Sequence, residues 1–310
     1  MMEKHISVML DEAISLLNLK DDSIIVDSTL GYGGHSSCIL ARIKKGFLFA
    51  FDQDSEAIRH STDRLNKIGT NFAIIKSNFV NLKEKLAEKN VEKVDGVLFD
   101  LGVSSPQLDD RERGFSYHED ARLDMRMDKD NPLSAYEVVN NYSKEELTSI
   151  FYKYGEDKFS RNIAKKIVEY RENKPIETTL ELAEIIKTAV PMKFRKDKHP
   201  ARQIFQAIRI EVNHELDVIR PALEQALSLL NVGGRVVVIT FHSLEDRIVK
   251  NYFKEMIEID PKLKGLPNLP PEKLPDYQLV VNKAVKPKEE ELEKNPRARS
   301  AKLRVIERVK

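Results

Sequence analysis

One stretch near the N-terminus constrains the fold of this chain more than any other. Residues 24–36 read Ile-Ile-Val-Asp-Ser-Thr-Leu-Gly-Tyr-Gly-Gly-His-Ser. The apolar run that ends in Asp27 predicts a buried parallel strand, and the glycines that follow predict a tight turn that a ligand can approach closely. A helix is expected to start at Ser36, with free N–H groups that suit a polar or anionic ligand. The pattern therefore favours a ligand site; a purely structural strand-to-helix turn is the alternative.

Three more strands are predicted in the same β-α rhythm, at residues 46–51, 72–76 and 94–99. Such alternation predicts a parallel, doubly wound sheet that binds ligands at the carboxyl ends of its strands. Asp52 follows the second strand, where an acidic residue accepts hydrogen bonds from ribose hydroxyls. Asp54 is predicted to cap a helix over residues 55–66.

The β-α alternation stops after about Pro106, and the chain then reads as a loop followed by helices. Capping boxes are predicted at Ser143 and Thr178. The later elements are predicted to be a fifth strand at 233–241, a helix at 244–259 and closing strands at 277–285 and 302–309. We therefore predict an α/β fold with a seven-stranded Rossmann-like sheet. Its domain comprises residues 1–108 and 217–310, and an all-helical insertion occupies residues 109–216.

Composition narrows the class of protein. The chain has 310 residues, of which 41% are hydrophobic and 33% charged, with a net charge of +1. A nucleic-acid surface must therefore come from local clustering of charge. The single cysteine, Cys38, excludes an internal disulfide framework and a cysteine zinc site, and no metal ligands are predicted. There is no apolar run of membrane-spanning length and no signal peptide, so we expect a cytoplasmic protein.

Six motifs closely resemble those of the bacterial ribosomal small subunit methyltransferase H family, also called MraW. They lie at residues 27–36, 100–109, 113–128, 199–210, 241–247 and 295–300. The resemblance runs nearly end to end and implies a class I methyltransferase sheet. It also implies S-adenosylmethionine (SAM) as cofactor and methylation of N4 of a cytosine in the decoding region of 16S ribosomal RNA. The implied partner is that RNA or the assembled small subunit, with no membrane; a homodimer stays open.

The resemblance also implies the cofactor contacts, residue by residue: Gly33, Gly34, His35, Asp52, Phe79, Asp100 and Gln107. Asp52 would hold the ribose diol and Phe79 would pack on the adenine ring. Each has a structural alternative: Phe79 as a core aromatic, His35 as a cap or surface residue, and Asp100 as the cap of the next turn.

The reaction implied is methyl transfer from a sulfonium to an exocyclic amine. The lone pair of that amine is delocalised into the cytosine ring, so acceptors near its hydrogens can orient it toward the methyl carbon. In-line positioning, with reacting atoms about 3 Å apart, should supply much of the acceleration. We predict that Asp100 and Ser104 are catalytic, with the backbone and hydroxyls of residues 102–105 receiving the amine. Whether Asp100 is a true general base stays open.

Two basic runs are candidates for the RNA surface. One spans residues 193–209, and the other, residues 294–310, carries a net charge of +6. Such runs are usually solvated faces, but two of them beside a ligand crevice favour phosphate contact. The predicted RNA contacts are Lys198, Arg202, His242, Arg297 and Arg299. The target cytosine would have to leave its stack, and the insertion would serve as a wall or lid for the RNA.

Three other functions are weighed. A nicotinamide-dependent oxidoreductase would use the same glycine turn, although the spacing of Gly31, Gly33 and Gly34 lacks the full dinucleotide fingerprint. A ribosome-assembly factor could keep the fold without catalysis. The segment His242-Ser243-Leu244-Glu245-Asp246 resembles hydrolase residues but lacks a nucleophile elbow, and Ser243 is predicted to cap the following helix.

Overall fold

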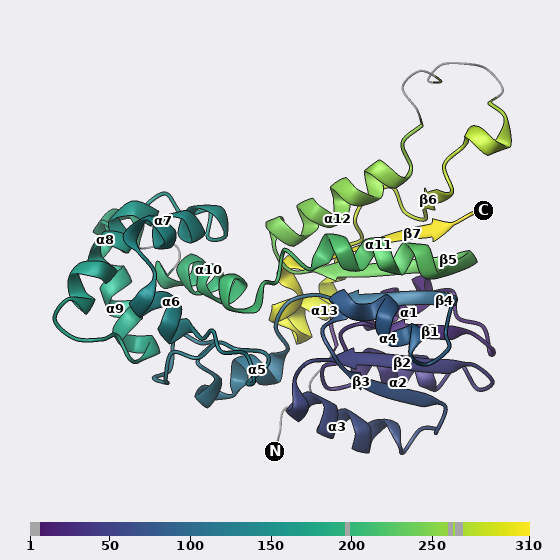
Figure 1. The fold of residues 1–310 in the computed structure, drawn as a ribbon, viewed down its shortest axis with the longest axis horizontal. Coiled ribbons are helices and arrows are strands. Elements are labelled where there is room, and N and C mark those ends of the chain that lie inside the picture. Colours follow the sequence, from purple (N-terminus) through teal and green to yellow (C-terminus); the bar gives the residue numbers. More distant parts are fainter. Residues whose placement is uncertain (1–6, 196–198, 260–262, 264–268) are drawn as a thin grey trace. The chain divides into compact units, whose positions relative to one another are not determined.

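The computed structural model describes residues 7–195, 199–259, 263 and 269–310. Contacts divide the chain into two compact units, which we call the sheet unit (residues 1–102 and 216–310) and the helical unit (residues 103–215) (Figure 1). The sequence-based boundaries lay at 108/109 and 216/217, so the structural division assigns α5 (Ser105–Asp109) to the helical unit.

The sheet unit is built on seven strands in the order β3-β2-β1-β4-β5-β7-β6. The first five in this order are parallel, and β7 runs antiparallel to both β5 and β6. The strands are β1 Ile24–Asp27, β2 Phe47–Asp52, β3 Phe72–Lys76, β4 Val94–Asp100, β5 Leu230–Thr240, β6 Tyr277–Leu279 and β7 Lys302–Arg308. The predicted fold class, a seven-stranded α/β sheet with a helical insertion, is confirmed.

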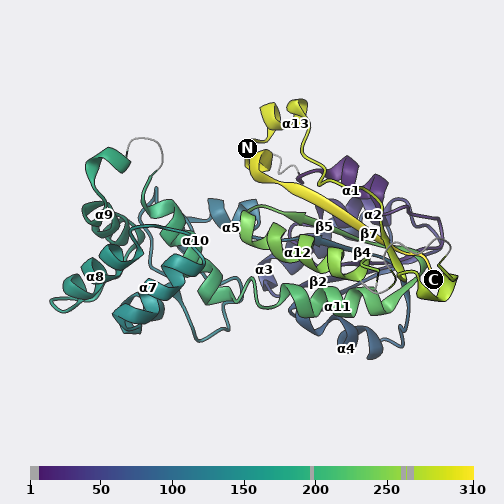
Figure 2. The ribbon, with the colours of Figure 1, turned by 90° about the horizontal axis from the view of Figure 1, so that it is seen from above.

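The central strands are mostly apolar because both faces of the sheet are covered. Successive side chains point to opposite faces. In β4, Val97 and Phe99 therefore join one core cluster, and Leu98 joins the other. Helices α4, α11 and α12 cover the first face, and α1, α2 and α3 cover the second (Figure 2). The helices of the sheet unit are α1 Leu10–Leu16, α2 Gly34–Leu40, α3 Ser55–Leu65, α4 Leu82–Ala87, α11 Ile219–Leu229, α12 Ser243–Met256 and α13 Glu289–Lys294, with short 3-10 turns at Phe79–Asn81 (η1), Pro271–Lys273 (η5) and Pro296–Ser300 (η6).

Local signals placed the start of α3 correctly, whereas two other helix starts need correction. Asp54 caps α3 as predicted, its Oδ1 accepting from the Glu56 N–H at 2.9 Å. Helix α2 begins at Gly34, earlier than predicted, because Gly33 already occupies the N-cap position. The prediction that Ser243 caps α12 is wrong: His242 is the N-cap residue and Ser243 is the first helical residue.

The last part of the sheet is shorter than predicted. Strand β6 pairs with β7 only over Tyr277–Leu279. The chain then bends and rejoins β7 at an isolated bridge between Val285 and Leu303. The predicted strand at 277–285 is therefore a short strand, a bend and a single bridge.

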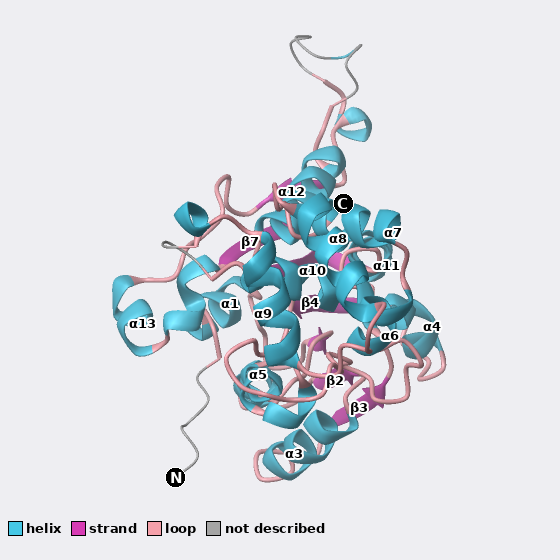
Figure 3. Ribbon diagram, turned by 90° about the vertical axis from the view of Figure 1, so that its left-hand side faces the viewer, coloured by secondary structure: helices cyan, strands magenta, loops and turns pink. Residues whose placement is uncertain are grey.

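The helical unit consists of helices joined by loops (Figure 3). Ser143 forms the predicted capping box with Glu146. At Thr178 only half of the predicted capping box is formed. Its hydroxyl accepts from the Glu181 N–H at 3.4 Å, but the Glu181 carboxylate accepts from the Glu177 N–H and not from the Thr178 N–H. The elements are α5, η2 Arg111–Arg113, α6 Ala135–Asn141, α7 Lys144–Lys153, α8 Ser160–Arg171, α9 Thr179–Ala189, η3 Met192–Phe194 and α10 Ala201–Asn213.

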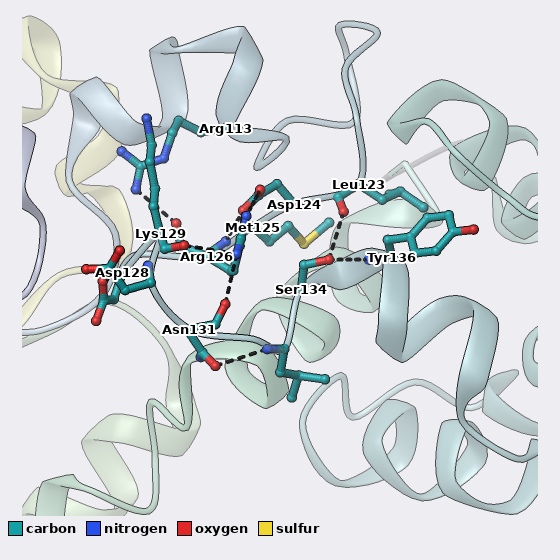
Figure 4. Close-up of polar contacts among 12 residues, drawn as sticks. Arg113, Leu123, Asp124, Met125, Arg126, Asp128, Lys129, Asn131, Ser134 and Tyr136 are labelled. Atoms are coloured by element: carbon teal, nitrogen blue, oxygen red, sulfur yellow. Dashed lines mark hydrogen bonds and ion pairs between the residues drawn. The ribbon is translucent and has the colours of Figure 1, made fainter.

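A loop within the helical unit is fixed by buried arginine contacts (Figure 4). Arg126 makes a bidentate ion pair with Asp124 at 2.7–3.0 Å and donates to the carbonyls of Lys129 and Asn131. Arg113 donates to the carbonyls of residues 126 and 127. These guanidinium groups satisfy loop carbonyls that no strand or helix pairs, so this part of the 113–128 motif is structural. Among the described helices, none combines the length and apolar composition that a bilayer crossing requires.

Candidate functional site

The turn from β1 to α2 brings backbone groups to the carboxyl edge of the sheet. Gly33 has a φ of +74°, which favours glycine,. A Cβ on Gly34 would lie 1.8 Å from Ser7 Oγ and 3.1 Å from Ser7 Cβ, so a side chain at this position would require Ser7 to move. The Ser61 hydroxyl donates to the Gly31 carbonyl at 2.7 Å and holds α3 against the turn. Internal packing already requires these glycines; their contact with a cofactor stays a prediction.

Asp52, at the end of β2, faces this turn. Its Oδ2 accepts from the Gly31 N–H and its Oδ1 from the Asp54 N–H, both at 2.8 Å. Burial raises the pKa of Asp52 to about 6 against these hydrogen bonds, and the charges of Asp54 and Asp27 act in the same direction as burial. A carboxylate has about four acceptor positions. Each oxygen of Asp52 therefore keeps a lone pair that two neighbouring hydroxyls could use.

Asp100, at the end of β4, has one oxygen without a partner. Its backbone N–H donates to Thr29 Oγ1 at 2.6 Å, and its Oδ2 lies 3.5 Å from His35 Nδ1. Its Oδ1 is buried and has no hydrogen-bond partner among the described residues. Burial raises the pKa of Asp100 well above its usual value, and the charges of Asp27 and Glu245 add to this. A buried, unsatisfied acceptor is expensive unless a ligand donates to it.

His35 is held beside Asp100 with one ring nitrogen fixed as a donor. The ring is buried, and its Nε2 is 3.2 Å from the Val8 carbonyl oxygen. A carbonyl only accepts, so Nε2 carries a hydrogen. Nδ1 then faces Asp100 Oδ2 at a distance of 3.5 Å. A proton held by either group can form a hydrogen bond between them.

Two further acids near Asp100 were not predicted as site residues. Asp27 is buried, and it accepts from the Ser36 hydroxyl at 2.6 Å and from the Thr29 N–H at 3.2 Å. Burial raises the pKa of Asp27 to about 6 despite these bonds. Glu245 is buried at the start of α12 and accepts from the Phe241 N–H at 2.8 Å. Asp27 ends the first strand of the sheet, and this position in the sequence could have identified it as a site residue,. The sequence around Glu245 indicates only an acidic residue in the first turn of a helix. The acids together favour a cationic ligand.

Phe79 lies in η1, after β3, and is half-buried. Its ring meets Phe99 edge to face, with centroids 5.6 Å apart and an interplanar angle of 88°. The contact with Phe99 fixes one edge of the Phe79 ring in the core. Packing of the Phe79 ring on an adenine stays a prediction.

Ser104 and Gln107 lie in the helical unit, where they cap α5. The Gln107 N–H donates to Ser104 Oγ at 3.4 Å, and the Ser104 N–H donates to Gln107 Oε1 at 3.1 Å. The Ser104 hydroxyl therefore accepts the cap bond and keeps its own proton to donate. The catalytic role of Ser104 and the cofactor contact of Gln107 stay predictions.

The five predicted RNA contacts differ in their surroundings. Lys198 lies outside the described residues. Arg202, in the first turn of α10, and Arg297 and Arg299, in η6, are exposed. The side chain of His242 is only 12% exposed, and its Nε2 lies 3.1 Å from Glu245 Oε1.

Part of each basic run is occupied by internal contacts. Near the C-terminus, Lys302 Nζ and Arg304 Nε bind Asp246 at 2.8 and 2.7 Å, and Arg308 Nη1 donates to the Leu230 carbonyl.

The same holds in the helical unit. Arg209 makes a bidentate pair with Glu215 at 2.8 Å, and Arg195 Nε donates to the Val190 carbonyl at 2.7 Å. The charge of a run in the sequence therefore overstates what an RNA could contact.

Comparisons with known proteins identify the family of this chain. The model of the MraW methylase family matches residues 2–309. Ribosomal RNA small subunit methyltransferase H of Exiguobacterium sibiricum is 54% identical over 310 residues, covering 100% of this chain and 99% of the relative. Two solved structures also match. An rRNA methylase from Streptococcus thermophilus has a TM-score of 0.43 and 14% identity, with 100% and 99% coverage. A SAM-dependent O-methyltransferase from Thermotoga maritima has a TM-score of 0.41 and 12% identity, covering 100% of this chain and 69% of that one. Such low TM-scores add nothing to the assignment. The full-length family match and the close relative show that this chain belongs to the MraW methylase family.

Proposed function

We propose that this protein transfers a methyl group from SAM to N4 of a cytosine in the decoding region of 16S ribosomal RNA. The family and the relative named for the small-subunit RNA support the reaction and its substrate. The observation that carries the proposal is Asp100: a half-buried side chain at the carboxyl end of a central parallel strand, whose Oδ1 is buried and satisfied by no described residue.

The residues at this edge fit SAM. Both oxygens of Asp52 keep an acceptor position for the ribose diol beyond their backbone bonds,. Phe79 offers a half-buried ring to the adenine, and Gly33 and Gly34 keep side chains away from the ligand. The buried acids near Asp100 suit a positive charge,.

When bound, SAM supplies a methyl group on a positively charged sulfur, which keeps the electron pair of the C–S bond as the amine attacks. Asp100 Oδ1 then accepts a hydrogen bond from the N4 amine and orients its lone pair toward the methyl carbon. The amine loses one proton as the N–C bond forms. The Asp100 carboxyl group, with His35 Nδ1 lying 3.5 Å from its Oδ2, lies where that proton can be received,.

The helical unit is proposed to hold the RNA as a wall or lid, with Ser104 and Gln107 at its start. Arg202, Arg297 and Arg299 would contact phosphates, and His242 would line the base pocket. The cytosine has to leave its stack to reach the methyl group. Because ribosomal RNA is the substrate, we place the protein in the cytoplasm. A homodimer stays a prediction that light scattering after size exclusion checks.

Transfer of tritium from labelled SAM tests the proposal. We expect label in small subunits that lack the modification, on N4 of one cytosine after nuclease digestion and mapping. Subunits that already carry the modification are the control and should take up no label. Label on another base or on protein, or binding of NAD in place of SAM, would refute the proposal.

A further inference from the structure

The structure joins two aromatic residues, from separate motifs, that have no part in the site described above. Tyr117, from the 113–128 motif, stacks on His199, from the 199–210 motif: their ring centroids are 4.9 Å apart and the interplanar angle is 17°. Tyr117 also lies 4.3 Å from the ring of His118 and meets Phe205 edge to face at 5.5 Å. Phe205 is buried, whereas Tyr117 and His199 are half-buried and His118 is exposed. A buried ring thus supports a cluster of accessible ones.

His199 presents a defined donor within this cluster. Its Nδ1 accepts the Ala201 N–H at 3.2 Å, so the hydrogen of the neutral ring lies on Nε2,. Burial, followed by the charges of His118 and Lys187, lowers the pKa of His199, while Glu184 opposes them. The ring is therefore neutral at pH 7. Nε2 makes no hydrogen bond with a described residue and is not among the buried atoms that lack a partner.

A cation lies close by in the chain, in the first turn of α10. Arg202 follows His199 by three residues, is exposed, and forms no ion pair within the described parts of the chain. An aromatic face, a single neutral donor and a free guanidinium are the groups that bind one nucleotide of a single strand. Bases stack on aromatic rings, their carbonyl and ring nitrogen atoms accept hydrogen bonds, and the phosphate binds the cation.

We propose that Tyr117, His199 and Arg202 form a nucleotide-binding platform for single-stranded RNA. A base stacks on the Tyr117–His199 rings and accepts from His199 Nε2, and Arg202 binds the adjoining phosphate. The platform rests on the proposed function, because it names a second contact of the same RNA. It concerns a nucleotide other than the cytosine that receives the methyl group.

His199→Asn tests the platform while keeping an acceptor for the Ala201 N–H. The asparagine oxygen can still accept the Ala201 N–H, but the ring and Nε2–H are lost. We expect the KM for small subunits, and the Kd of a single-stranded RNA measured by fluorescence anisotropy, to rise roughly tenfold. The kcat and the Kd for SAM should stay within about twofold, since the platform contacts neither reacting atom. Tyr117→Leu should behave like His199→Asn, whereas Tyr117→Phe keeps the ring and should match wild type.

Nitrogen NMR of the wild-type protein supplies a test that no folding defect can affect. We expect the Nε2–H tautomer of His199, and a shift of its Nε2 resonance when single-stranded RNA is added. A proton on Nδ1, or no shift at saturating RNA, would overturn the platform. So would unchanged KM and Kd in both ring-deleting variants while wild type methylates its substrate. If wild type binds RNA through His199 but transfers no methyl group, the platform stands and the proposed function fails.

Discussion

His35 Nδ1 and Asp100 Oδ2 lie 3.5 Å apart at the carboxyl edge of the sheet. The Val8 carbonyl fixes a hydrogen on the other ring nitrogen, so Nδ1 is the ring atom that faces the Asp100 carboxyl group,. The second oxygen of Asp100 is left buried and without a donor. Asp100 can therefore accept a hydrogen bond from a bound ligand, and its proposed role in the reaction depends on this free acceptor.

Replacing Asp100 by Ala should lower kcat by roughly 10²- to 10⁴-fold, the usual range for a lost acid–base group. Single-turnover transfer of labelled methyl groups measures this change. Asp100→Asn keeps an acceptor oxygen but cannot take a proton, so it separates orientation of the amine from proton removal. If Asp100→Ala keeps its turnover with normal SAM affinity, Asp100 has no part in the mechanism.

The preference for SAM over its demethylated product should depend on pH. Burial raises the pKa of both Asp27 and Asp52 to about 6, so each carboxyl is neutral below that pH and negative above it. Negative carboxylates attract the positively charged sulfonium of SAM, whereas the thioether of S-adenosylhomocysteine carries no charge. The affinity ratio of the two ligands, measured by calorimetry, should therefore rise as the pH increases from 5 to 7. A ratio that is constant over this range would show that these acids do not sense the sulfonium.

Asp246→Ala should destabilise the sheet unit by about 3 kcal/mol, because it leaves Arg304 unpaired and largely buried,. Burial alone would raise the pKa of Asp246, but its contacts with Arg304 and Lys302 hold that pKa below its usual value. The contribution is therefore present above the unfolded pKa and is lost as the pH falls through the folded one. Urea unfolding at pH 7 measures it. Glu255→Ala breaks the exposed pair with Arg220 and serves as the control, for which little change is expected,.

The double variant of Arg297 and Arg299 to Ala should weaken RNA binding and lower the slope of log Kd against log salt by about 1 to 2. Both side chains are exposed in η6. Stability should stay near wild type, in contrast to the Asp246 variant. An unchanged Kd and salt slope would remove η6 from the RNA surface and leave the C-terminal charge as a solvated face.

Much of the fold follows from local sequence signals. The apolar segments after Ser23 and Asn71 become β1 and β3, and Asp54 caps α3, because strand periodicity and cap chemistry act over a few residues,. The N-cap of α12 was predicted at Ser243 and lies at His242, because histidine is not a common N-cap residue,. The bend after Leu279 depends on the pairing of β7 with β5, which no local pattern encodes.

The site was less accessible to prediction than the fold. Asp52 and Asp100 could be found because they end strands of a parallel sheet. Glu245 and the ring of His199 could not, since their meaning comes from contacts made after folding. The charge available to RNA in the basic runs was overestimated for the same reason. Asp246 lies 56 residues before Lys302 in the chain, and the two meet because the antiparallel strand β7 brings Lys302 to α12.

A crystal structure of the protein with SAM bound tests most directly whether Asp100 faces the methyl donor. We expect ribose hydroxyls on Asp52, the adenine against Phe79, and the methyl group exposed on the side of Asp100 Oδ1. SAM bound elsewhere, or with its methyl group turned away from Asp100, would contradict the proposed role of Asp100.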